Sequence, residues 1–169
     1  VGGGMGGGSS DAATTLMMLN QLWQLNLSSE TLQTLGLSLG ADVPIFLYGH
    51  NAFATGIGEK LTPITLPERY FVVVVPPVHV STAKIFSSNL LTRETKSIRI
   101  ADFQATHHTV LLKNDLLPVV FALEPIVKKC YDALCNQVDQ EYEVRMTGSG
   151  CCLFIETKDL TTAENILYN

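Results

Sequence analysis

The residues best suited to chemistry stand at the start of the chain, where a run of glycines leads directly into a segment that favours a helix. Six of the first eight residues are glycine, and Met5 separates them into two triplets. Because glycine has no Cβ, successive backbone N–H groups can converge on one anion, and a bulky phosphate can approach the main chain. Ser9, Ser10 and Asp11 follow as residue types that cap helices, and a helix N-terminus also favours an anion. This stretch therefore predicts a polyphosphate-binding loop.

A glycine-rich stretch can also be a flexible linker or a scar of expression. A linker would not need the large apolar side chain of Met5, and here no polar spacer separates the run from the helical segment. No lysine precedes Ser9, so the run is not a Walker loop, and Gly4-x-Gly6-x-x-Ser9 lacks the third glycine of the dinucleotide fingerprint. The loop is thus predicted to bind phosphate in a different way.

A single carboxylate, Asp42, stands in the segment Leu39-Gly40-Ala41-Asp42-Val43-Pro44. Proline is typical of the first turn of a helix, so Asp42 could be the N-cap of a short helix. A lone acid among apolar residues could instead accept a proton from a substrate hydroxyl. The pattern alone favours the cap and leaves both roles open.

A second glycine-rich turn, Thr147-Gly148-Ser149-Gly150, lies between two expected strands at 143–146 and 151–155. Such a turn is most often only a hairpin connection. Together with the first glycine run, however, it could form a second place where a ligand approaches the backbone closely.

These segments resemble the GHMP kinases, the family of galactokinase, homoserine kinase and mevalonate kinase. Gly2 to Ala13 is similar to the second signature motif of the family, and Thr147 to Gly150 resembles the third. A triple glycine on both sides of an apolar residue is similar, more narrowly, to the kinases that act on 4-diphosphocytidyl-2-C-methyl-D-erythritol in the non-mevalonate isoprenoid pathway. Leu39 to Pro44 resembles the segment that carries the catalytic aspartate.

The resemblance implies transfer of the γ-phosphoryl group of ATP to the 2-hydroxyl of this cytidine diphosphate substrate, with Asp42 as the catalytic base. It implies that Phe86 stacks on the cytosine. Mg²⁺ is expected on the phosphates of ATP, with Ser10 as its protein ligand. The residues expected to bind ATP are Gly2, Gly3, Gly4, Met5, Gly6, Gly7, Gly8, Ser9 and Ser10. Those expected to bind the substrate are Thr82, Phe86, Gly148, Ser149 and Gly150.

Three other functions stay open at this point. Another small-molecule GHMP kinase, of the homoserine or mevalonate type, would share the loop but would not need Phe86. A non-catalytic nucleotide-binding module would bind ATP and tolerate the loss of Asp42. A structural domain with an incidental glycine tail would need neither residue.

The composition favours a small-molecule partner. Charged residues make up 16% of the 169 residues, against about a quarter in average globular proteins, and the net charge is −5. No basic cluster exceeds Lys128-Lys129, so neither nucleic acid nor an anionic membrane is expected as a partner. The cysteines lack the spacing of a metal site and are expected to be reduced thiols: Cys130, Cys135, Cys151 and Cys152. No apolar run approaches the ~20 residues of a membrane span, so a cytoplasmic protein is predicted.

The expected fold class is α+β, with the two-domain architecture that the resemblance implies. Residues 1–67 would be part of a ribosomal-protein-S5-like N-terminal domain that binds ATP. Residues 68–169 would be a ferredoxin-like C-terminal domain, incomplete at its end. Pro63 and Pro67 mark the boundary.

In the first region we expect three helices and a hairpin. The helices span residues 12–25, run from Ser28 or Ser29 to Gly36, and begin at Pro44. The hairpin pairs strands at 52–55 and 59–62 and is predicted to be structural. The residues expected to face the core from the first two helices are Leu16, Leu19, Leu22, Trp23, Leu32 and Leu35.

In the second region residues 70–75 predict a buried strand, because they are dense in β-branched side chains. Ser81 or Thr82 would cap a short helix, and residues 90–103 are expected to be irregular. The adjacent pair His107-His108 would point to different faces of a helix and so would not share a metal.

The next helix is expected to open at Asn114-Asp115-Leu116. Leu117 stands where the family often has glutamate, and this argues against a functional role there. Residues 124–138 predict a further helix with a core-facing stripe: Ile126, Val127, Cys130 and Leu134.

Residue 1 already lies inside the glycine loop, whereas a phosphate loop normally follows a strand. We therefore expect an N-terminal segment to be missing, together with the lysine that the family places near the catalytic aspartate. On this expectation residues 1–169 alone are inactive.

Overall fold

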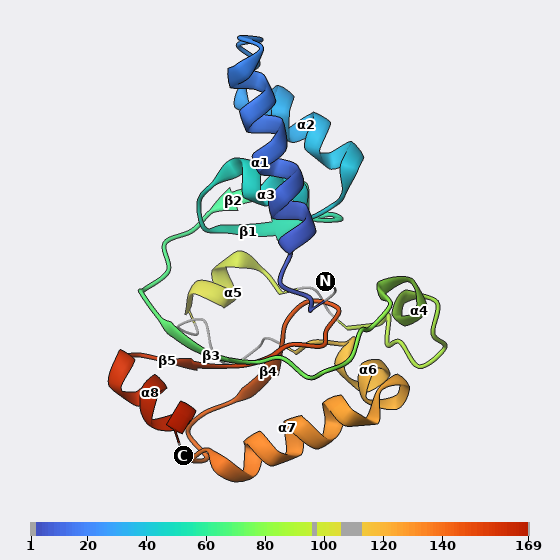
Figure 1. The fold of residues 1–169 in the computed structure, drawn as a ribbon, viewed down its shortest axis with the longest axis vertical. Coiled ribbons are helices and arrows are strands. Elements are labelled where there is room, and N and C mark those ends of the chain that lie inside the picture. The colour runs from blue at the N-terminus through green and yellow to red at the C-terminus, as the bar shows by residue number, and fades with distance from the viewer. Residues whose placement is uncertain (1–2, 96–97, 106–112, 169) are drawn as a thin grey trace. The chain divides into compact units, whose positions relative to one another are not determined.

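The computed structural model describes residues 3–95, 98–105 and 113–168. The chain divides into two compact units (Figure 1). One unit is Gly6–Pro67, and the other begins at Glu68 and also includes the start of the chain as far as Met5. The domain boundary proposed from the sequence lies at the same place, between Pro67 and Glu68, although residues 3–5 cluster with the second unit. The mixture of helices and antiparallel sheets confirms the α+β class.

The first unit is helical with one hairpin. Its elements are α1 (Gly7–Leu22), α2 (Ser29–Leu39), α3 (Val43–Tyr48), β1 (Ala52–Thr55) and β2 (Lys60–Pro63). The three helices pack against one another. The strands pair antiparallel with Ala52 opposite Pro63 and Thr55 opposite Lys60, as the hairpin prediction required.

Helix α1 begins within the glycine run, earlier than predicted. Gly6 is its N-cap and has a φ of 70°, in the left-handed region that favours glycine, and Gly7 is already helical. The caps expected at Ser9 to Asp11 are therefore wrong. The predicted core face also fails at its end, because the helix stops at Leu22, which is 72% exposed, and Trp23 is 62% exposed.

Helix α2 begins as predicted but ends later. The Ser28 hydroxyl caps it by accepting a hydrogen bond from the Thr31 N–H at 3.2 Å. Gly36 was expected to end the helix, yet it is buried inside it, and the end lies at Leu39. A Cβ on Gly36 would lie 2.5 Å from Leu47 Cδ1, so this glycine allows α3 to approach. Leu32 is buried as predicted, whereas Leu35 is exposed.

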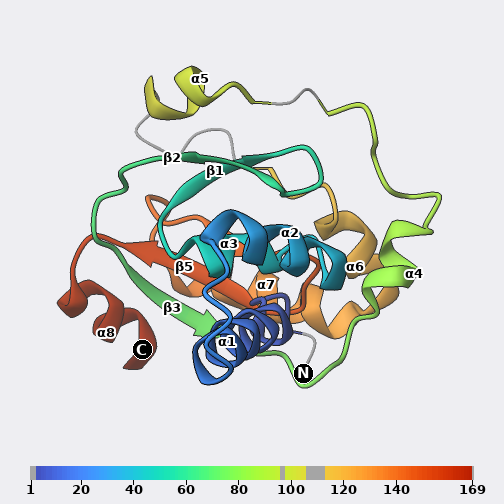
Figure 2. The same ribbon diagram turned by 90° about the horizontal axis from the view of Figure 1, so that it is seen from above.

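Within its described residues, the second unit contains a three-stranded antiparallel sheet with five helices. The strands, in the order β3-β5-β4, are β3 (Tyr70–Val74), β5 (Leu153–Thr157) and β4 (Val144–Met146). The register places Val72 opposite Ile155, and Ile155 opposite Val144. Figure 2 shows β3 and β5 side by side. The helices are α4 (Thr82–Phe86), α5 (Ile100–Ala105), α6 (Leu117–Leu123), α7 (Pro125–Gln137) and α8 (Leu160–Tyr168).

One face of this sheet forms the core, and α7 and α8 cover it (Figure 1). Val72, Leu153 and Ile155 are buried on that face. The prediction of a buried strand holds for only one face of β3, because Phe71 and Val73 point to the other face and are exposed. An antiparallel sheet needs cover on one face only, and its side chains then alternate.

The helix prediction for residues 124–138 matches α7 except at one position of its stripe. Val127 is buried, and Cys130 and Leu134 pack against the core, but Ile126 is exposed. The stretch expected to be irregular contains α5 from Ile100. The prediction about His107-His108 lies outside the described residues.

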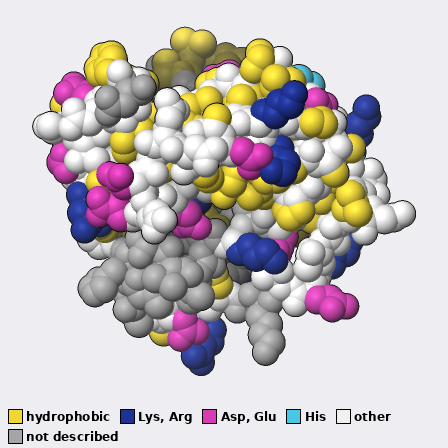
Figure 3. Space-filling model, turned by 90° about the horizontal axis from the view of Figure 1, so that it is seen from below, with side chains coloured by type: hydrophobic (Ala, Val, Ile, Leu, Met, Phe, Trp, Pro, Cys, Tyr) yellow, Lys and Arg dark blue, Asp and Glu magenta, His cyan; other side chains and the backbone are white. Residues whose placement is uncertain are grey.

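The surface around α7 and α8 carries mixed charges. Figure 3, which views the molecule from this side, shows basic and acidic side chains scattered among apolar ones. None of the described helices is long and apolar enough to cross a membrane.

Candidate functional site

The first turn of α1 provides backbone donors in open space. The first hydrogen bond within the helix runs from the Ser10 N–H to the Gly6 carbonyl, at 2.8 Å. The N–H groups of Gly7, Gly8 and Ser9 therefore have no partner within the helix. A Cβ added to Gly7 or Gly8 would meet no atom within 4 Å. Packing does not require glycine at these two positions, but close approach of an anion to the backbone would.

Two structural features require glycine at position 6 but are not found at Gly7 or Gly8. The φ of Gly6 is positive, and a Cβ there would lie 2.8 Å from the Phe46 ring of α3. The apolar contact fixes the start of α1 against α3. Gly6 therefore positions the turn, whereas Gly7 and Gly8 leave room beside it.

Asp42 occupies the N-cap position of α3, but its side chain makes no capping hydrogen bond. The side chain is exposed, and the next two residues, Val43 and Pro44, are buried. The backbone itself satisfies the Val43 N–H, which donates to the Gly40 carbonyl at 3.1 Å. The structure thus does not support the capping role, and the carboxylate is available at the surface of the first unit.

The β1–β2 turn supports the segment that carries Asp42. Gly58 has a φ of 120°, and a Cβ there would lie 3.0 Å from the Ala41 carbonyl oxygen. Within the turn, the Ile57 N–H donates to the Glu59 carboxylate at 2.8 Å. Hydrogen bonds from the backbone of Glu59 itself and of Ile57 lower the pKa of Glu59. The hairpin that was predicted to be structural therefore packs directly against the residue before Asp42.

In the second unit the two glycine-rich segments lie against each other. The Gly3 carbonyl accepts hydrogen bonds from the Thr147 hydroxyl and from the Cys152 N–H, both at 3.1 Å. Gly4 has a φ of 73°, and a Cβ there would lie 2.4 Å from the Thr147 carbonyl oxygen. Gly148 has a positive φ as well, and its Cβ would lie 3.0 Å from the Gly4 carbonyl oxygen. Only glycine permits this approach of the two backbones.

The structure also brings together two of the residues that the sequence analysis assigned to the substrate. The hydroxyl oxygens of Thr82 and Ser149 are 2.8 Å apart and hydrogen-bonded, although 67 positions separate them in the sequence. Thr82 begins α4, whose cap is the Ser81 hydroxyl, as predicted. Phe86 lies one turn further along α4 and is 51% exposed. Gly2 lies outside the described residues.

Sequence analysis missed a polar residue at this turn, Asn114. Its amide nitrogen donates to the carbonyls of Met146 at 3.1 Å and of Gly148 at 2.8 Å, and its oxygen accepts from the Leu116 N–H at 3.0 Å. The sequence signal was the asparagine just before a helix, but the two bonds to the turn join segments more than 30 residues apart. A local pattern cannot reveal such contacts.

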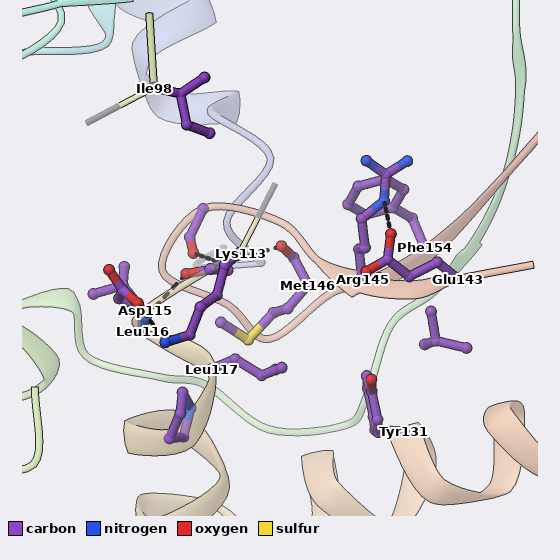
Figure 4. A pocket seen from close by; sticks show the side chains of 14 residues that line it. Ile98, Lys113, Asp115, Leu116, Leu117, Tyr131, Glu143, Arg145, Met146 and Phe154 are labelled. Atoms are coloured by element: carbon purple, nitrogen blue, oxygen red, sulfur yellow. Dashed lines mark hydrogen bonds and ion pairs between the residues drawn. The ribbon is translucent and has the colours of Figure 1, made fainter. Parts of the chain in front are cut away.

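A cavity of about 750 Å³ borders the turn in the second unit (Figure 4). Of the predicted site residues, only Gly148 lines it. Lys113 forms an ion pair with Asp115 at 3.3 Å, and hydrogen bonds from Thr95 and then Lys113 lower the pKa of Asp115. On the other side the Arg145 guanidinium lies 4.8 Å from the centre of the Phe154 ring and pairs with Glu156. The charged groups that line the cavity are thus neutralised within the protein.

The described residues contain no group of three or more His, Cys, Asp or Glu side chains that could hold a metal ion. All four cysteines are free thiols, as predicted. Cys151 and Cys152 are buried, and burial raises the pKa of Cys152. Any metal at the glycine loop would therefore depend on few protein ligands.

Two family models match the chain. The model of the GHMP kinases N terminal domain matches residues 1–50, and that of the GHMP kinases C terminal region matches residues 90–169.

Curated relatives match almost the whole chain. The 4-diphosphocytidyl-2-C-methyl-D-erythritol kinase of Cupriavidus necator is 51% identical over 168 residues, and that of Cupriavidus metallidurans is 49% identical over 168 residues. Each alignment covers 99% of this chain and 56% of the relative. The chain thus spans little more than half the length of these relatives.

A solved structure is also similar. The crystal structure of a 4-(cytidine 5'-diphospho)-2C-methyl-D-erythritol kinase matches with a TM-score of 0.76 and 31% identity. The match covers 98% of this chain and 61% of that one.

Proposed function

The chain belongs to the GHMP kinases, and we propose that this protein transfers the γ-phosphoryl group of ATP to the 2-hydroxyl of 4-diphosphocytidyl-2-C-methyl-D-erythritol. GHMP kinases use ATP as co-substrate. The observation that carries the proposal is the pair of glycine-rich segments. One has N–H groups without an intrahelical partner and open space beside Gly7 and Gly8, and the other is held against Gly3 and Gly4. The names of the similar kinases supply the acceptor.

The glycine turn supplies the phosphate site of the proposal. The N–H groups of Gly7, Gly8 and Ser9 donate to the oxygens of the triphosphate, and the positive end of α1 favours their charge. Because phosphoryl transfer passes through a loose transition state, fixed donors contribute by positioning the phosphate and by stabilising its charge. Glycine at positions 7 and 8 leaves the space that the phosphate would fill.

Asp42 is the proposed acceptor of the proton. The oxygen of the substrate 2-hydroxyl forms a bond to the γ-phosphorus, and the bond between the γ-phosphorus and the β–γ bridging oxygen breaks. The hydroxyl proton passes to the Asp42 carboxylate, and ADP leaves together with the phosphate monoester. A carboxylate that is exposed and makes no capping bond suits this role.

Mg²⁺ is part of the proposal as a partner of ATP. Magnesium in kinases is held by phosphate oxygens and waters with only one or two protein ligands, so it fits a chain whose described residues form no metal cluster. The Ser10 hydroxyl, in the first turn of α1, is the protein ligand we propose. The ion would neutralise charge on the phosphates.

The substrate contacts are assigned to the second unit. The ring of Phe86 is exposed enough to stack on the cytosine, and the hydroxyls of Thr82 and Ser149 offer hydrogen bonds to polar groups of the substrate. Gly148 and Gly150 keep the turn close to the backbone of Gly4.

A phosphorylation assay against three acceptors tests the proposal. With ATP and Mg²⁺, the full-length protein should phosphorylate the cytidine diphosphate substrate and should leave mevalonate and homoserine unchanged. Phe86→Ala should raise the KM for the cytidine substrate while the KM for ATP stays the same, and Phe86→Tyr, which keeps an aromatic face, should behave like the wild type. Phosphorylation of mevalonate or homoserine would assign the protein to another branch of the family.

A further inference from the structure

We propose that Asn114 is a positioning residue that holds the Thr147–Gly150 turn in the geometry required by the glycine loop and by Ser149. The inference rests on the proposed function, because it assigns Asn114 a part in placing that site. Asn114 is not expected to touch either substrate. It acts through the backbone of the turn.

The partners of Asn114 fix the orientation of its amide. Met146 and Gly148 present carbonyl oxygens, which can only accept, and Leu116 presents an N–H, which can only donate. One donor hydrogen therefore points to Gly148 in the turn, the other points to Met146 at the end of β4 just before the turn, and the oxygen points to the start of α6. If Asn114 served only to begin α6, its oxygen would suffice, and the two donor contacts would have no purpose.

The turn that Asn114 holds has little freedom to move without disturbing Gly3 and Gly4. The Gly150 N–H donates to the Thr147 carbonyl at 2.8 Å, which closes the turn. The Thr147 hydroxyl and the Cys152 N–H both donate to Gly3. The backbone of Gly4 lies so close that even a methyl group would clash with Thr147. A shift of the turn must therefore displace the beginning of the glycine loop.

The same turn also sets the position of a side chain assigned to the substrate. Ser149 lies directly after Gly148, whose carbonyl accepts the 2.8 Å bond from Asn114. The Ser149 hydroxyl is hydrogen-bonded to Thr82 on α4. Loss of the Asn114 hydrogen bonds would therefore weaken the hydrogen bonds to Gly3 and also the hydrogen bond between Ser149 and Thr82.

The first test removes the donors. Asn114→Ala should lower kcat/KM by about 10²-fold, since small misplacements of positioning groups have effects of this size. In the same variant, the amides of Gly150 and Cys152 should exchange with deuterium at least tenfold faster than in the wild type. An acceleration on the order of tenfold is what the loss of the stabilisation from one hydrogen bond would produce. The amides of β5 should be unchanged, because they belong to the central strand of the sheet.

A second variant gives a readout that a purely structural role would not move. Asn114→Asp keeps the oxygen that accepts from Leu116 and puts a carboxylate opposite two carbonyl oxygens, which raises the pKa of the introduced carboxyl. Once protonated, this carboxyl can donate to one carbonyl again. The activity of this variant relative to the wild type should therefore rise as the pH falls from 8 to 6. The neighbouring charges, Lys113 and Asp115, are paired with each other at 3.3 Å.

Asn20→Ala is the matched control. The Asn20 side chain also bonds the backbone in both directions, to the carbonyl and the N–H of Leu27, near the C-terminal end of α1. This variant should lose stability without losing activity per folded molecule.

The outcomes separate this inference from the proposed function. Asn114 variants that match the control in activity, with unchanged exchange at Gly150 and Cys152, would overturn the inference even if the wild type is an active kinase. A folded, full-length wild type that phosphorylates none of the three acceptors would overturn the proposed function. In that case the exchange rates of Gly150 and Cys152 still decide whether Asn114 holds the turn.

Discussion

The Asp42 side chain stands where a cap would stand and makes no capping bond, so its two possible roles can be separated at this residue. We predict that Asp42→Ala lowers turnover by ~10²-fold or more, because it removes the proposed proton acceptor. The free energy of unfolding should change by less than about 0.5 kcal/mol, whereas the loss of a true cap costs about 1 kcal/mol. Urea unfolding and steady-state kinetics on the same preparation provide both values. A clear loss of stability with full activity would make Asp42 a cap.

The glycines of the loop allow a second prediction at this scale. Gly8→Val places a branched side chain in the open space beside the first turn of α1 and should raise the KM for ATP at least tenfold if phosphate occupies that space. Gly8→Ala should do so to a smaller extent, although alanine favours the helix by up to about 1 kcal/mol. Gly6→Val is a poor test because it would clash with Phe46. ATP binding by Gly8→Val equal to that of the wild type, measured by calorimetry, would exclude this part of the site.

From the sequence, the glycine run as a whole could be identified as a candidate phosphate-binding loop. The separate role of each glycine could be seen only in the structure. Gly4 and Gly148 are required by contact between two backbones, and Gly6 by the Phe46 ring. Gly7 and Gly8 have no packing partner within 4 Å. These differences depend on residues more than 30 positions away, which no local pattern contains.

At the scale of elements, the existence of helices and strands was easier to predict than their ends. The Ser28 cap, the β1–β2 hairpin and the strand β3 follow local rules of capping, turn chemistry and β-branching. The start of α1 was missed because glycine, a poor helix former, forms its first turn. Gly36 was read as a helix end for the same reason, although tertiary packing explains it.

The packing of α2 on α3 is testable at Gly36. Gly36→Ala improves helix propensity by about 1 kcal/mol, but its Cβ would lie 2.9 Å from Val43 Cγ1 as well as close to Leu47. Val43 is β-branched and buried and cannot easily move. We expect a net destabilisation of about 1–3 kcal/mol, as for other overpacked sites. A variant more stable than the wild type in thermal unfolding would show that α2 and α3 are packed less closely.

At the scale of the whole molecule, the burial of the cysteines reports on the fold of the second unit. Cys135 is exposed and should react first with a maleimide, and Cys130 should follow because it is half-buried. Cys151 and Cys152 should react only after denaturation, since both are buried and burial raises the pKa of Cys152. Mass spectrometry after timed labelling gives the order. Early labelling of Cys151 or Cys152 would contradict the packing of Cys152 under Gly3.

The α+β class followed from the sequence because its patterns and its resemblance to the GHMP kinases agreed. The strand order β3-β5-β4 and the contact of Gly3 with Thr147 could not be derived from local patterns, because both join segments from distant parts of the chain. The same applies to the contacts of Asn114 with Met146 and Gly148, because α6 and α7 separate these residues from Asn114 in the sequence.

The central claim is transfer of a phosphoryl group from ATP to a hydroxyl of the cytidine diphosphate substrate at the glycine loop and Asp42. A ³¹P NMR time course of the full-length protein with ATP, Mg²⁺ and this substrate tests the claim most directly. The γ-phosphate signal of ATP should disappear while ADP and a phosphate monoester on the substrate appear in equal amounts, and Asp42→Ala should abolish both changes. Release of inorganic phosphate in place of the monoester, or unchanged ATP with folded wild-type protein, would contradict the account.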